Sequence, residues 1–271
     1  MNQAIGFIGT GQMATALATG FLKTNTLKPN QLFGYDISTA ALLKFAAATG
    51  GTAADSVKSI VGNSQIVFLS VKPQQMNQVL HEIEKVHLPV KEKLWITIAA
   101  GLPLATYLKE LGTAARIVRV MPNTPCLVGE GALGFCASEG ATAEDKTLAK
   151  ELLETVGFVA EFPERQLNAV TGLSGSGPAI VYMLIEAMAD GGVKMGLARN
   201  TAQNLAAQTV LGSAKVVLQT GEHPGALKDK VCSPRGTTIY GVHSLEKDGF
   251  RSAVINAVEA ATRRSNELGS E

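Results

Sequence analysis

The sequence predicts an α/β protein whose N-terminal part forms a doubly wound parallel sheet and whose C-terminal part is entirely helical. Up to Pro163, short apolar runs alternate with longer amphipathic segments. From residue 164 to 271, apolar residues recur at helical spacing and no alternating strand is evident. Composition agrees, because 28 glycines and only 5% aromatic residues are typical of tight turns and close backbone packing.

The N-terminal half contains five apolar runs that we interpret as strands, most of them flanked by turn residues. They are residues 5–8, 32–35, 66–71, 94–98 and 117–120. Helical spacing separates them in segments 14–22, 40–48, 76–83 and 104–111. Since short connections between alternating strands and helices favour parallel pairing, we expect helices on both faces of one sheet within residues 1–163.

The pattern changes near Pro163, and we expect a second, all-helical domain over residues 164–271. Its predicted helices are residues 179–195, 201–218 and 251–268. Apolar helices without aromatic side chains to fill wide gaps favour tight contacts between helices, including contacts between subunits.

Charge and length exclude several classes of function. The 271 residues carry a net charge of +1, and neither half concentrates positive charge, so we expect no nucleic-acid partner and no membrane partner. No stretch reaches the roughly 18 consecutive apolar residues of a membrane span. The three cysteines, Cys126, Cys136 and Cys232, have no paired spacing, so we expect no disulfide, no metal site and a reduced, cytoplasmic location.

A glycine-rich turn indicates a dinucleotide site of the Rossmann type. Gly9-Thr-Gly-Gln-Met-Ala14 matches G-x-G-x-x-A and lies between a predicted strand and a predicted helix. The first glycine permits the turn, the second lets the backbone approach a pyrophosphate, and the helix N-terminus offers N–H groups to the anion. The predicted cofactor-binding residues here are Ile8, Gly9, Thr10, Gly11, Gln12 and Met13.

Asp36 directly follows the predicted strand 32–35 and lies 25 residues after Gly11. A carboxylate there accepts hydrogen bonds from the ribose diol of NAD and repels the 2′-phosphate of NADP. Two alternatives remain open. Asp36 could cap the helix that begins near Ser38, or Ser38 and Thr39 could hold a phosphate if the loop turns the carboxylate away.

Two further strand ends lie on the same side of the predicted sheet, where ligands of such sheets bind. Val71, Lys72 and Pro73 follow one strand, and Lys72 either approaches the cofactor or is solvated. Ala99, Ala100 and Gly101 follow another and form a wall of small residues that leaves room for a nicotinamide.

Three segments combine Gly or Pro with hydroxyl residues: 121–125, 172–178 and 233–239. Such segments present N–H and O–H donors to a small anion, although each could simply cap a helix.

Taken together, these segments resemble the pyrroline-5-carboxylate reductase family over nearly the whole chain. The shared motifs occur in the family's order: G-F-I-G-T-G-Q-M-A, V-K-P-Q, A-A-G, V-R-V-M-P-N-T-P, V-T-G-L-S-G-S-G-P-A, A-D-G-G-V-K-M-G-L, H-P-G-A-L-K-D, S-P-R-G-T-T-I and G-F-R-S-A-V-I-N-A-V. The resemblance implies an N-terminal Rossmann domain, a C-terminal helical domain that interlocks two subunits into a dimer or a higher homo-oligomer, and reduction of L-1-pyrroline-5-carboxylate to L-proline with NAD(P)H, the last step of proline biosynthesis.

The resemblance also implies roles for particular residues. The Thr238 hydroxyl donates to the ring nitrogen of the substrate as the catalytic group, while Ser233, Gly236 and Thr237 bind the substrate carboxylate. Asn123 lies near nicotinamide and substrate, and Glu164 contributes to substrate binding from the domain junction.

Three positions depart from the family pattern. Arg235 replaces a glycine in the S-P-G-G-T-T loop, which adds a cation and removes glycine's tolerance of positive φ. Ile180 replaces a common tyrosine, and we expect a change of packing only. Asp36 favours NADH, whereas the family resemblance favours NADPH.

Two alternatives to the reductase require residues that can be checked in this sequence. A β-hydroxyacid dehydrogenase needs a lysine base in the helix after its glycine-rich segment, but here no lysine follows residues 172–178 until Lys194. A catalytically silent nucleotide-sensing protein could share the fold, although it would not need the paired hydroxyls of Thr237 and Thr238.

Overall fold

The computed structural model describes residues 3–269, which divide into two compact units. One unit contains residues 3–176 together with 260–269, and the other contains Gly177–Glu259. The functional boundary that the sequence places between residues 163 and 164 stays a prediction.

The first unit is built on an eight-stranded sheet of order β3-β2-β1-β4-β5-β6-β7-β8. The strands are β1 (Ile5–Ile8), β2 (Leu32–Tyr35), β3 (Thr52–Ala53), β4 (Ile66–Leu69), β5 (Leu94–Thr97), β6 (Arg116–Met121), β7 (Gly131–Ala137) and β8 (Gly157–Glu161). Every neighbouring pair is parallel except β6 and β7. The order places β1 and β4 side by side at the point where the winding reverses, and this is where open α/β sheets bind ligands.

The five strands expected from the sequence are confirmed, but β3, β7 and β8 were not predicted. The two-residue β3 is too short to give a pattern. In β7, the sequence Gly-Ala-Leu-Gly-Phe-Cys-Ala contains small residues and no alternation, and it is buried along most of its length. The predicted parallel sheet is therefore correct for its first six strands and carries one reversal at β7.

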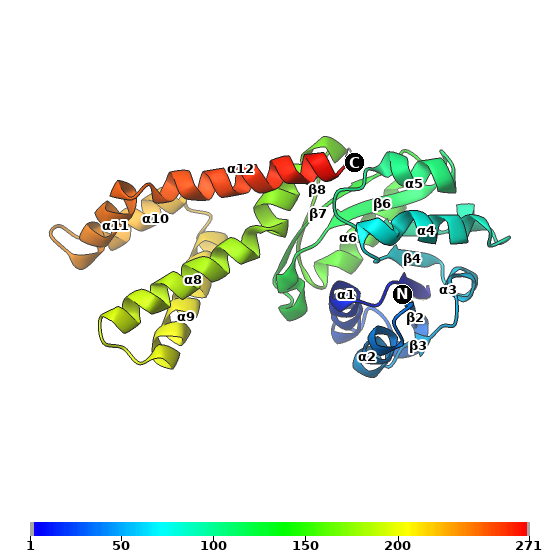
Figure 1. The fold of residues 1–271 in the computed structure, drawn as a ribbon, viewed down its shortest axis with the longest axis horizontal. Coiled ribbons are helices and arrows are strands. Elements are labelled where there is room, and N and C mark those ends of the chain that lie inside the picture. The colour runs from blue at the N-terminus through cyan, green and yellow to red at the C-terminus, as the bar shows by residue number, and fades with distance from the viewer. Residues whose placement is uncertain (1–2, 270–271) are drawn as a thin grey trace. The chain divides into compact units, whose positions relative to one another are not determined.

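Helices cover both faces of the sheet (Figure 1). One face carries α1 (Gln12–Lys23), α2 (Thr39–Thr49) and α6 (Ala143–Glu154), and the other carries α3 (Val57–Asn63), α4 (Pro73–Glu84) and α5 (Leu104–Leu111). Short 3₁₀ turns lie at η1 (Pro29–Gln31), η2 (Val90–Glu92), η3 (Thr124–Val128) and η4 (Glu164–Gln166). The doubly wound arrangement expected from the sequence is thus confirmed, with α3 and α6 as additional helices.

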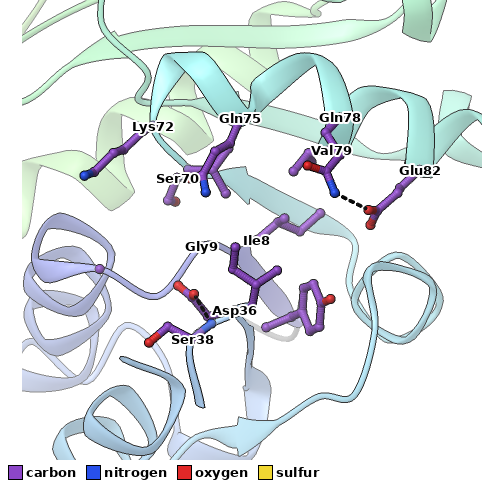
Figure 2. Close-up of a pocket in the computed structure, with 14 residues that line it drawn as sticks. Ile8, Gly9, Asp36, Ser38, Ser70, Lys72, Gln75, Gln78, Val79 and Glu82 are labelled. Atoms are coloured by element: carbon purple, nitrogen blue, oxygen red, sulfur yellow. Dashed lines mark hydrogen bonds between the residues drawn. The ribbon is translucent and has the colours of Figure 1, made fainter. Parts of the chain in front are cut away.

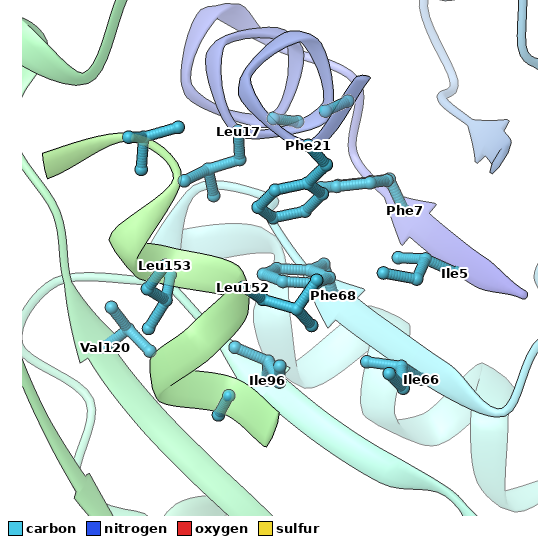
Figure 3. Close-up of a cluster of buried hydrophobic side chains, with 14 of the residues drawn as sticks. Ile5, Phe7, Leu17, Phe21, Ile66, Phe68, Ile96, Val120, Leu152 and Leu153 are labelled. Atoms are coloured by element: carbon cyan, nitrogen blue, oxygen red, sulfur yellow. The ribbon is translucent and has the colours of Figure 1, made fainter. Parts of the chain in front are cut away.

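Aromatic side chains concentrate in the core beneath α1. Phe7, Phe21, Phe45 and Phe68 are fully buried, and the rings of Phe7 and Phe68 stack with centroids 4.7 Å apart. Figure 3 shows Phe21 on α1 facing the strand residues Phe7 and Phe68. These rings fix the first helix on the sheet, and the glycine-rich turn lies between that helix and β1.

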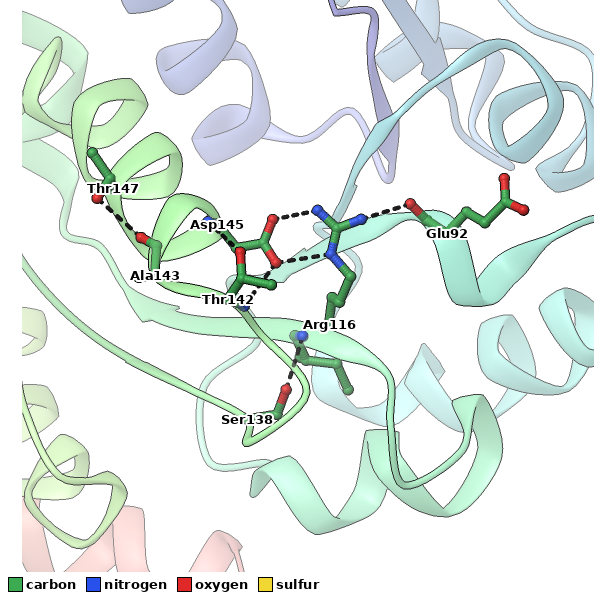
Figure 4. Close-up of polar contacts among 8 residues, drawn as sticks. Glu92, Arg116, Ser138, Thr142, Ala143, Asp145 and Thr147 are labelled. Atoms are coloured by element: carbon green, nitrogen blue, oxygen red, sulfur yellow. Dashed lines mark hydrogen bonds and ion pairs between the residues drawn. The ribbon is translucent and has the colours of Figure 1, made fainter.

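A salt bridge between the partly exposed Arg116 and the buried Asp145 joins β6 to α6 (Figure 4). Arg116 donates through Nε to Asp145 at 2.8 Å and through Nη2 to the second carboxylate oxygen, while Nη1 donates to the Glu92 carbonyl oxygen at 2.9 Å. Asp145 also closes a capping box with Thr142 at the start of α6. Burial raises the pKa of Asp145, but the hydrogen bonds from Arg116 and Thr142 and the charge of Arg116 together hold the pKa below its usual value.

After η4 the chain forms a short helix, α7 (Leu167–Val170), and then a π-helical turn, η5 (Thr171–Gly175). Thr171 and Ser174 each donate their hydroxyl to the carbonyl oxygen four residues earlier, at 2.9 and 3.0 Å. The glycine-serine segment 172–178 is therefore helical in its first part.

The second unit is all-helical, as the sequence predicts. It contains α8 (Gly177–Lys194), α9 (Arg199–Thr220), α10 (Pro224–Val231) and α11 (Thr237–Lys247), and α12 (Phe250–Leu268) begins in it. Its own apolar core is small and centres on Ala189, Ala202 and Ala206. In the part of the chain that the structure describes, none of the helices has the length and hydropathy needed to cross a membrane.

Candidate active site

The glycine-rich turn lies where β1 meets α1, against the end of β4. Gly9 has φ of +93°, and a Cβ atom there would come within 2.7 Å of the Ser70 carbonyl carbon. Its N–H donates to the Tyr35 carbonyl oxygen at 2.8 Å. Both conformation and contact therefore require glycine at position 9.

The start of α1 fits a bound anion. Gly11 is the residue before the helix and has no side chain to cap it, no acidic residue occupies the first turn, and a Cβ at Gly11 would meet nothing within 4 Å. The first N–H groups of the helix are thus left for a ligand. The buried Ser70 hydroxyl, which lies beside this turn, has no hydrogen-bond partner among the described residues. These features fit the pyrophosphate and ribose of a dinucleotide.

A groove of about 290 Å³ runs beside this turn (Figure 2). Six of the predicted cofactor residues line it: Ile8, Gly9, Gly11, Asp36, Val71 and Lys72. The remaining predicted residues, Thr10, Gln12, Met13, Pro73, Ala99, Ala100 and Gly101, do not line this groove, and their cofactor contacts stay predictions. The α4 residues Gln75, Gln78, Val79 and Glu82 also line it and were not predicted, because only the placement of α4 beside β4 reveals them.

Asp36 braces the turn from the end of β2. Its Oδ2 accepts the Thr10 N–H at 2.7 Å and the Thr10 hydroxyl at 3.3 Å, and its Oδ1 accepts the Ser38 N–H at 2.8 Å. The residue that caps α2 is Ser38, whose hydroxyl accepts the Ala41 N–H at 3.3 Å. The alternative in which Asp36 caps this helix is therefore wrong, and the carboxylate faces the glycine-rich turn.

The segment Ala99–Gly101 joins β5 to α5. Ala99 is buried, its N–H donates to the Thr97 hydroxyl at 3.4 Å, and Gly101 adopts φ of +82°. At the other end of the segment, the Leu104 N–H donates to Glu164 at 2.6 Å. Glu164 therefore has a structural partner in this unit, and its predicted contact with substrate stays a prediction.

Asn123 follows β6 and is 7% exposed. Its Nδ2 donates to the Ser174 carbonyl oxygen at 3.0 Å, and its Oδ1 accepts the Ala132 N–H at 2.9 Å. The side chain ties the end of β6 to β7 and to the π-helical turn. The predicted contact of Asn123 with nicotinamide and substrate is not tested by these bonds.

The predicted substrate loop, Ser233–Thr238, lies in the second unit and consists of the end of the α10–α11 connection and the first two residues of α11. The Gly236 N–H donates to the Ser233 carbonyl oxygen at 3.0 Å, with Pro234 and Arg235 between them. Pro at the second position and a positive φ at the third define a type II turn. Since the Gly236 N–H serves this turn, a substrate carboxylate would have to share it.

The loop leads directly into α11. Gly236 precedes the helix without a side-chain cap, and a Cβ there would lie 2.2 Å from the Ser233 hydroxyl. Thr237 is exposed and Thr238 is half-buried on the first turn. The Ser233 hydroxyl and both threonines therefore surround one uncapped helix N-terminus, an arrangement suited to a carboxylate.

Arg235 occupies the left-handed region with φ of +58°. From the sequence, a residue other than glycine at this position could alter the conformation of the loop. The structure shows that the turn keeps the conformation that glycine favours, at the cost of strain on Arg235.

Comparison with known proteins identifies the family. A family model described as "Pyrroline-5-carboxylate reductase dimerisation" matches residues 164–268, and one described as "NADP oxidoreductase coenzyme F420-dependent" matches residues 4–101. The pyrroline-5-carboxylate reductase of Methanosarcina acetivorans is 48% identical over 99% of this chain and 98% of its own length. That of Glycine max is 45% identical over 98% of this chain and 96% of its own.

The chain belongs to the pyrroline-5-carboxylate reductase family. Solved structures of the family agree over the same length. The Plasmodium falciparum enzyme with NADP bound superposes with a TM-score of 0.89 at 37% identity, covering 99% of this chain and 98% of that one. The Coxiella burnetii enzyme gives 0.91 at 35% identity, covering 99% of both chains. A prephenate dehydrogenase from A. aeolicus, at 13% identity and a TM-score of 0.54, shares the fold alone.

Proposed function

We propose that this chain reduces L-1-pyrroline-5-carboxylate to L-proline with NAD(P)H. The strongest support is that this chain, a member of the family, has two helix N-termini without side-chain caps, each beside a turn that contains glycine. One follows Gly9–Gly11, and the other is surrounded by Ser233, Thr237 and Thr238. The first suits a dinucleotide and the second a small carboxylate.

Residues 1–163 are proposed to hold the cofactor and residues 164–271 to bind substrate and form the dimer. Gly9, Gly11 and the start of α1 bind the pyrophosphate, and Ala99–Gly101 lie against the nicotinamide. When bound, the reduced nicotinamide supplies the hydride. The chain contributes orientation and exclusion of water.

The catalytic role is proposed for Thr238, which is half-buried on the first turn of α11. Its hydroxyl donates to the ring nitrogen of the substrate and so stabilises the electron density that develops there. Ser233, Gly236 and Thr237 hold the carboxylate through hydroxyl and N–H donors, and Arg235 adds a positive charge beside them. Asn123 and Glu164 complete the proposed set.

We further infer that NADH is used at least as well as NADPH. Lys72 is the only Lys or Arg among the described residues that line the groove, and Asp36 stands where a 2′-phosphate would approach. The carboxylate would repel that phosphate. The Plasmodium falciparum relative has NADP bound, so the cofactor preference of this chain needs a direct measurement. Comparing kcat/KM for NADH and NADPH answers it, and a strong preference for NADPH would refute the role of Asp36.

We infer that the C-terminal helices form a homodimer or a higher homo-oligomer. Large apolar side chains are exposed throughout this region, including Val181, Tyr182, Met183, Leu205, Leu211, Val216, Leu218 and Ile255. A monomer of this size seldom exposes so many apolar side chains together. Light scattering coupled to size-exclusion chromatography should give at least twice the mass of 28.3 kDa.

The activity is tested with purified protein, pyrroline-5-carboxylate and each reduced cofactor. Oxidation of NADH or NADPH with formation of proline supports the proposal. Binding of cofactor without any turnover would favour a silent nucleotide-sensing protein. Turnover of a β-hydroxy acid with NAD(P), but not of the imine, would favour the dehydrogenase alternative.

A further inference from the structure

A partly buried ion pair near the β5–α5 segment joins Arg119 to Glu164, whose side chain is 36% exposed. Arg119 lies in the middle of β6, between Thr97 on β5 and Cys136 on β7, and its side chain is only 6% exposed. Its Nη1 donates to Oε1 of Glu164 at 2.8 Å. Burying a guanidinium costs desolvation energy, and an apolar residue at such a position often gives a protein of equal stability. We therefore explain this pair by what it positions and not by a contribution to stability.

The neighbours of Arg119 cannot replace Glu164 as its counter-ion. Burial raises the pKa of Tyr107 to about 12, and burial together with the Glu164 charge raises the pKa of Cys136 to about 12. Both groups are therefore neutral at physiological pH. Glu164 is the carboxylate that compensates Arg119.

The same Glu164 oxygen also holds the start of α5. Oε1 accepts the Leu104 N–H at 2.6 Å, and α5 has no cap of its own because Pro103 precedes it. One oxygen atom therefore links three segments: the buried centre of β6, the turn after β8 and the first residue of α5.

Residues 98–103 lie between this contact and a second buried one. At the β5 end, the Thr97 hydroxyl accepts the Ala99 N–H at 3.4 Å and donates to the Tyr107 hydroxyl at 2.6 Å. Thr97 and Tyr107 are both fully buried. The segment that carries Ala99, Ala100 and Gly101 is thus attached at both ends to polar groups inside the unit.

We propose that the Arg119–Glu164 pair is a positioning device that fixes segment 98–103, and with it the wall expected against the nicotinamide. The meaning of that wall rests on the proposed function, whereas the fixation itself does not. Glu164 acts through Leu104 and is a positioning residue. The family resemblance implies instead that Glu164 contacts the substrate, and the two roles predict different results.

The first experiment measures hydrogen exchange of the Leu104 amide without cofactor or substrate. We expect Glu164→Ala to raise its exchange rate by about tenfold or more, because the N–H loses its acceptor. Glu164→Gln keeps a carbonyl acceptor for this N–H but loses the charge that compensates Arg119, so its exchange rate should lie between those of wild type and Glu164→Ala. The matched control is Glu161→Ala, which removes a nearby exposed carboxylate that pairs with Lys146. Unchanged Leu104 exchange in Glu164→Ala overturns the proposal.

Arg119→Lys covers the case in which Glu164→Ala does not fold. It keeps the buried positive charge but loses the guanidinium geometry that fixes the carboxylate. We expect faster Leu104 exchange than in wild type. Wild-type exchange in this folded variant overturns the proposal as well.

The second experiment separates positioning from substrate contact. In Glu164→Ala, misplacement of segment 98–103 should lower kcat by about tenfold or more and raise the isotope effect seen with 4-deuterated cofactor, because hydride transfer becomes slower. Glu164→Gln should restore part of kcat, because it keeps the acceptor for the Leu104 N–H but not the charge opposite Arg119. A rise in KM for pyrroline-5-carboxylate alone would overturn positioning in favour of direct contact. If wild type shows no turnover, the proposed function fails, while the exchange result still decides the fixation.

Discussion

The two segments proposed to bind anions are held in different ways by the chain. The turn at Gly9–Gly11 is braced by Asp36 through Thr10, by the Tyr35 carbonyl oxygen through Gly9, and by the fully buried aromatic rings beneath α1. The loop at Ser233–Thr238 has one turn hydrogen bond, from Gly236 to Ser233, and most of its residues are exposed. The first site is preorganised within its own unit, whereas the second is mostly exposed and has few contacts that hold it.

The two turns also differ in the residue that adopts a positive φ. Gly9 adopts a positive φ that only glycine adopts freely, and it has backbone atoms of Ser70 and Val71 within 2.8 Å of an added Cβ. In the second loop the left-handed position carries Arg235, so the backbone there bears strain. A braced turn tolerates no side chain, while an exposed turn accepts one at a cost.

The largest effect is expected from Thr238→Ala. Loss of the hydroxyl that donates to the ring nitrogen should lower kcat/KM for pyrroline-5-carboxylate by about 10²- to 10³-fold, as for other donors to a developing charge. Thr238→Ser keeps the hydroxyl and serves as the control. Cofactor binding, measured by NADH fluorescence, should be unchanged in both. A wild-type rate in Thr238→Ala would reject the donor role and leave the exposed loop without its proposed chemistry.

The braced unit should lose stability when its Arg116–Asp145 pair is broken. Asp145→Ala removes the partner of a guanidinium that is about one-third exposed, together with one half of the α6 capping box. We expect a loss of about 2–3 kcal/mol in the free energy of unfolding, measured with urea. Glu144→Ala, one residue earlier and exposed, should change it by less than about 0.5 kcal/mol. Equal losses in the two variants would contradict the role of the Arg116–Asp145 pair.

The same pair predicts an acid dependence. Because the pKa of Asp145 is lower in the folded chain than in the unfolded chain, its stabilisation is fully present above the unfolded pKa of about 3.9 and is lost as pH falls through the folded pKa. As the pH is lowered below about 4, the free energy of unfolding should therefore fall more steeply for wild type than for Asp145→Asn. Parallel curves would show that another group controls this range.

Asp36 has two roles, because its carboxylate holds Thr10 by hydrogen bonds and also places a negative charge at the groove. The variant Asp36→Ser distinguishes these roles by their effects on the two cofactors. Loss of the charge should shift the ratio of kcat/KM for NADPH to that for NADH by about tenfold toward NADPH. Loss of the brace on Thr10 should lower both values together. Glu82→Gln removes another carboxylate that lines the groove and is the matched control. If Glu82→Gln shifts the ratio of kcat/KM for NADPH to that for NADH by the same amount, the cofactor preference depends on the total charge of the groove and not on Asp36.

Much of the braced unit could be predicted from sequence, because local patterns determine it. The run Ile5–Ile8, the turn Gly9–Gly11 and the position of Asp36 all follow from short-range rules. What sequence missed depends on distant partners. The small residues of β7 form a strand only because β6 and β8 lie beside them, and Gln75 and Gln78 line the groove only because α4 packs beside β4. The bond from Glu164 to Leu104 spans 60 positions and leaves no local pattern.

The smallest effect concerns Arg235→Gly, which tests the strain in the exposed loop. A left-handed conformation costs a residue with a Cβ about 1–2 kcal/mol, and glycine costs about 0.5–1 kcal/mol in added freedom of the unfolded chain. We therefore expect a net gain of about 0.5–1 kcal/mol in unfolding free energy, measured by urea denaturation. Arg235→Ala keeps the Cβ and should give no gain. If the Arg235 charge also assists carboxylate binding, both variants should raise KM for pyrroline-5-carboxylate alike, because both remove the cation. A stability gain with an unchanged KM would assign Arg235 to solvent, and a loss of stability in Arg235→Gly would show that side-chain contacts outweigh the strained backbone.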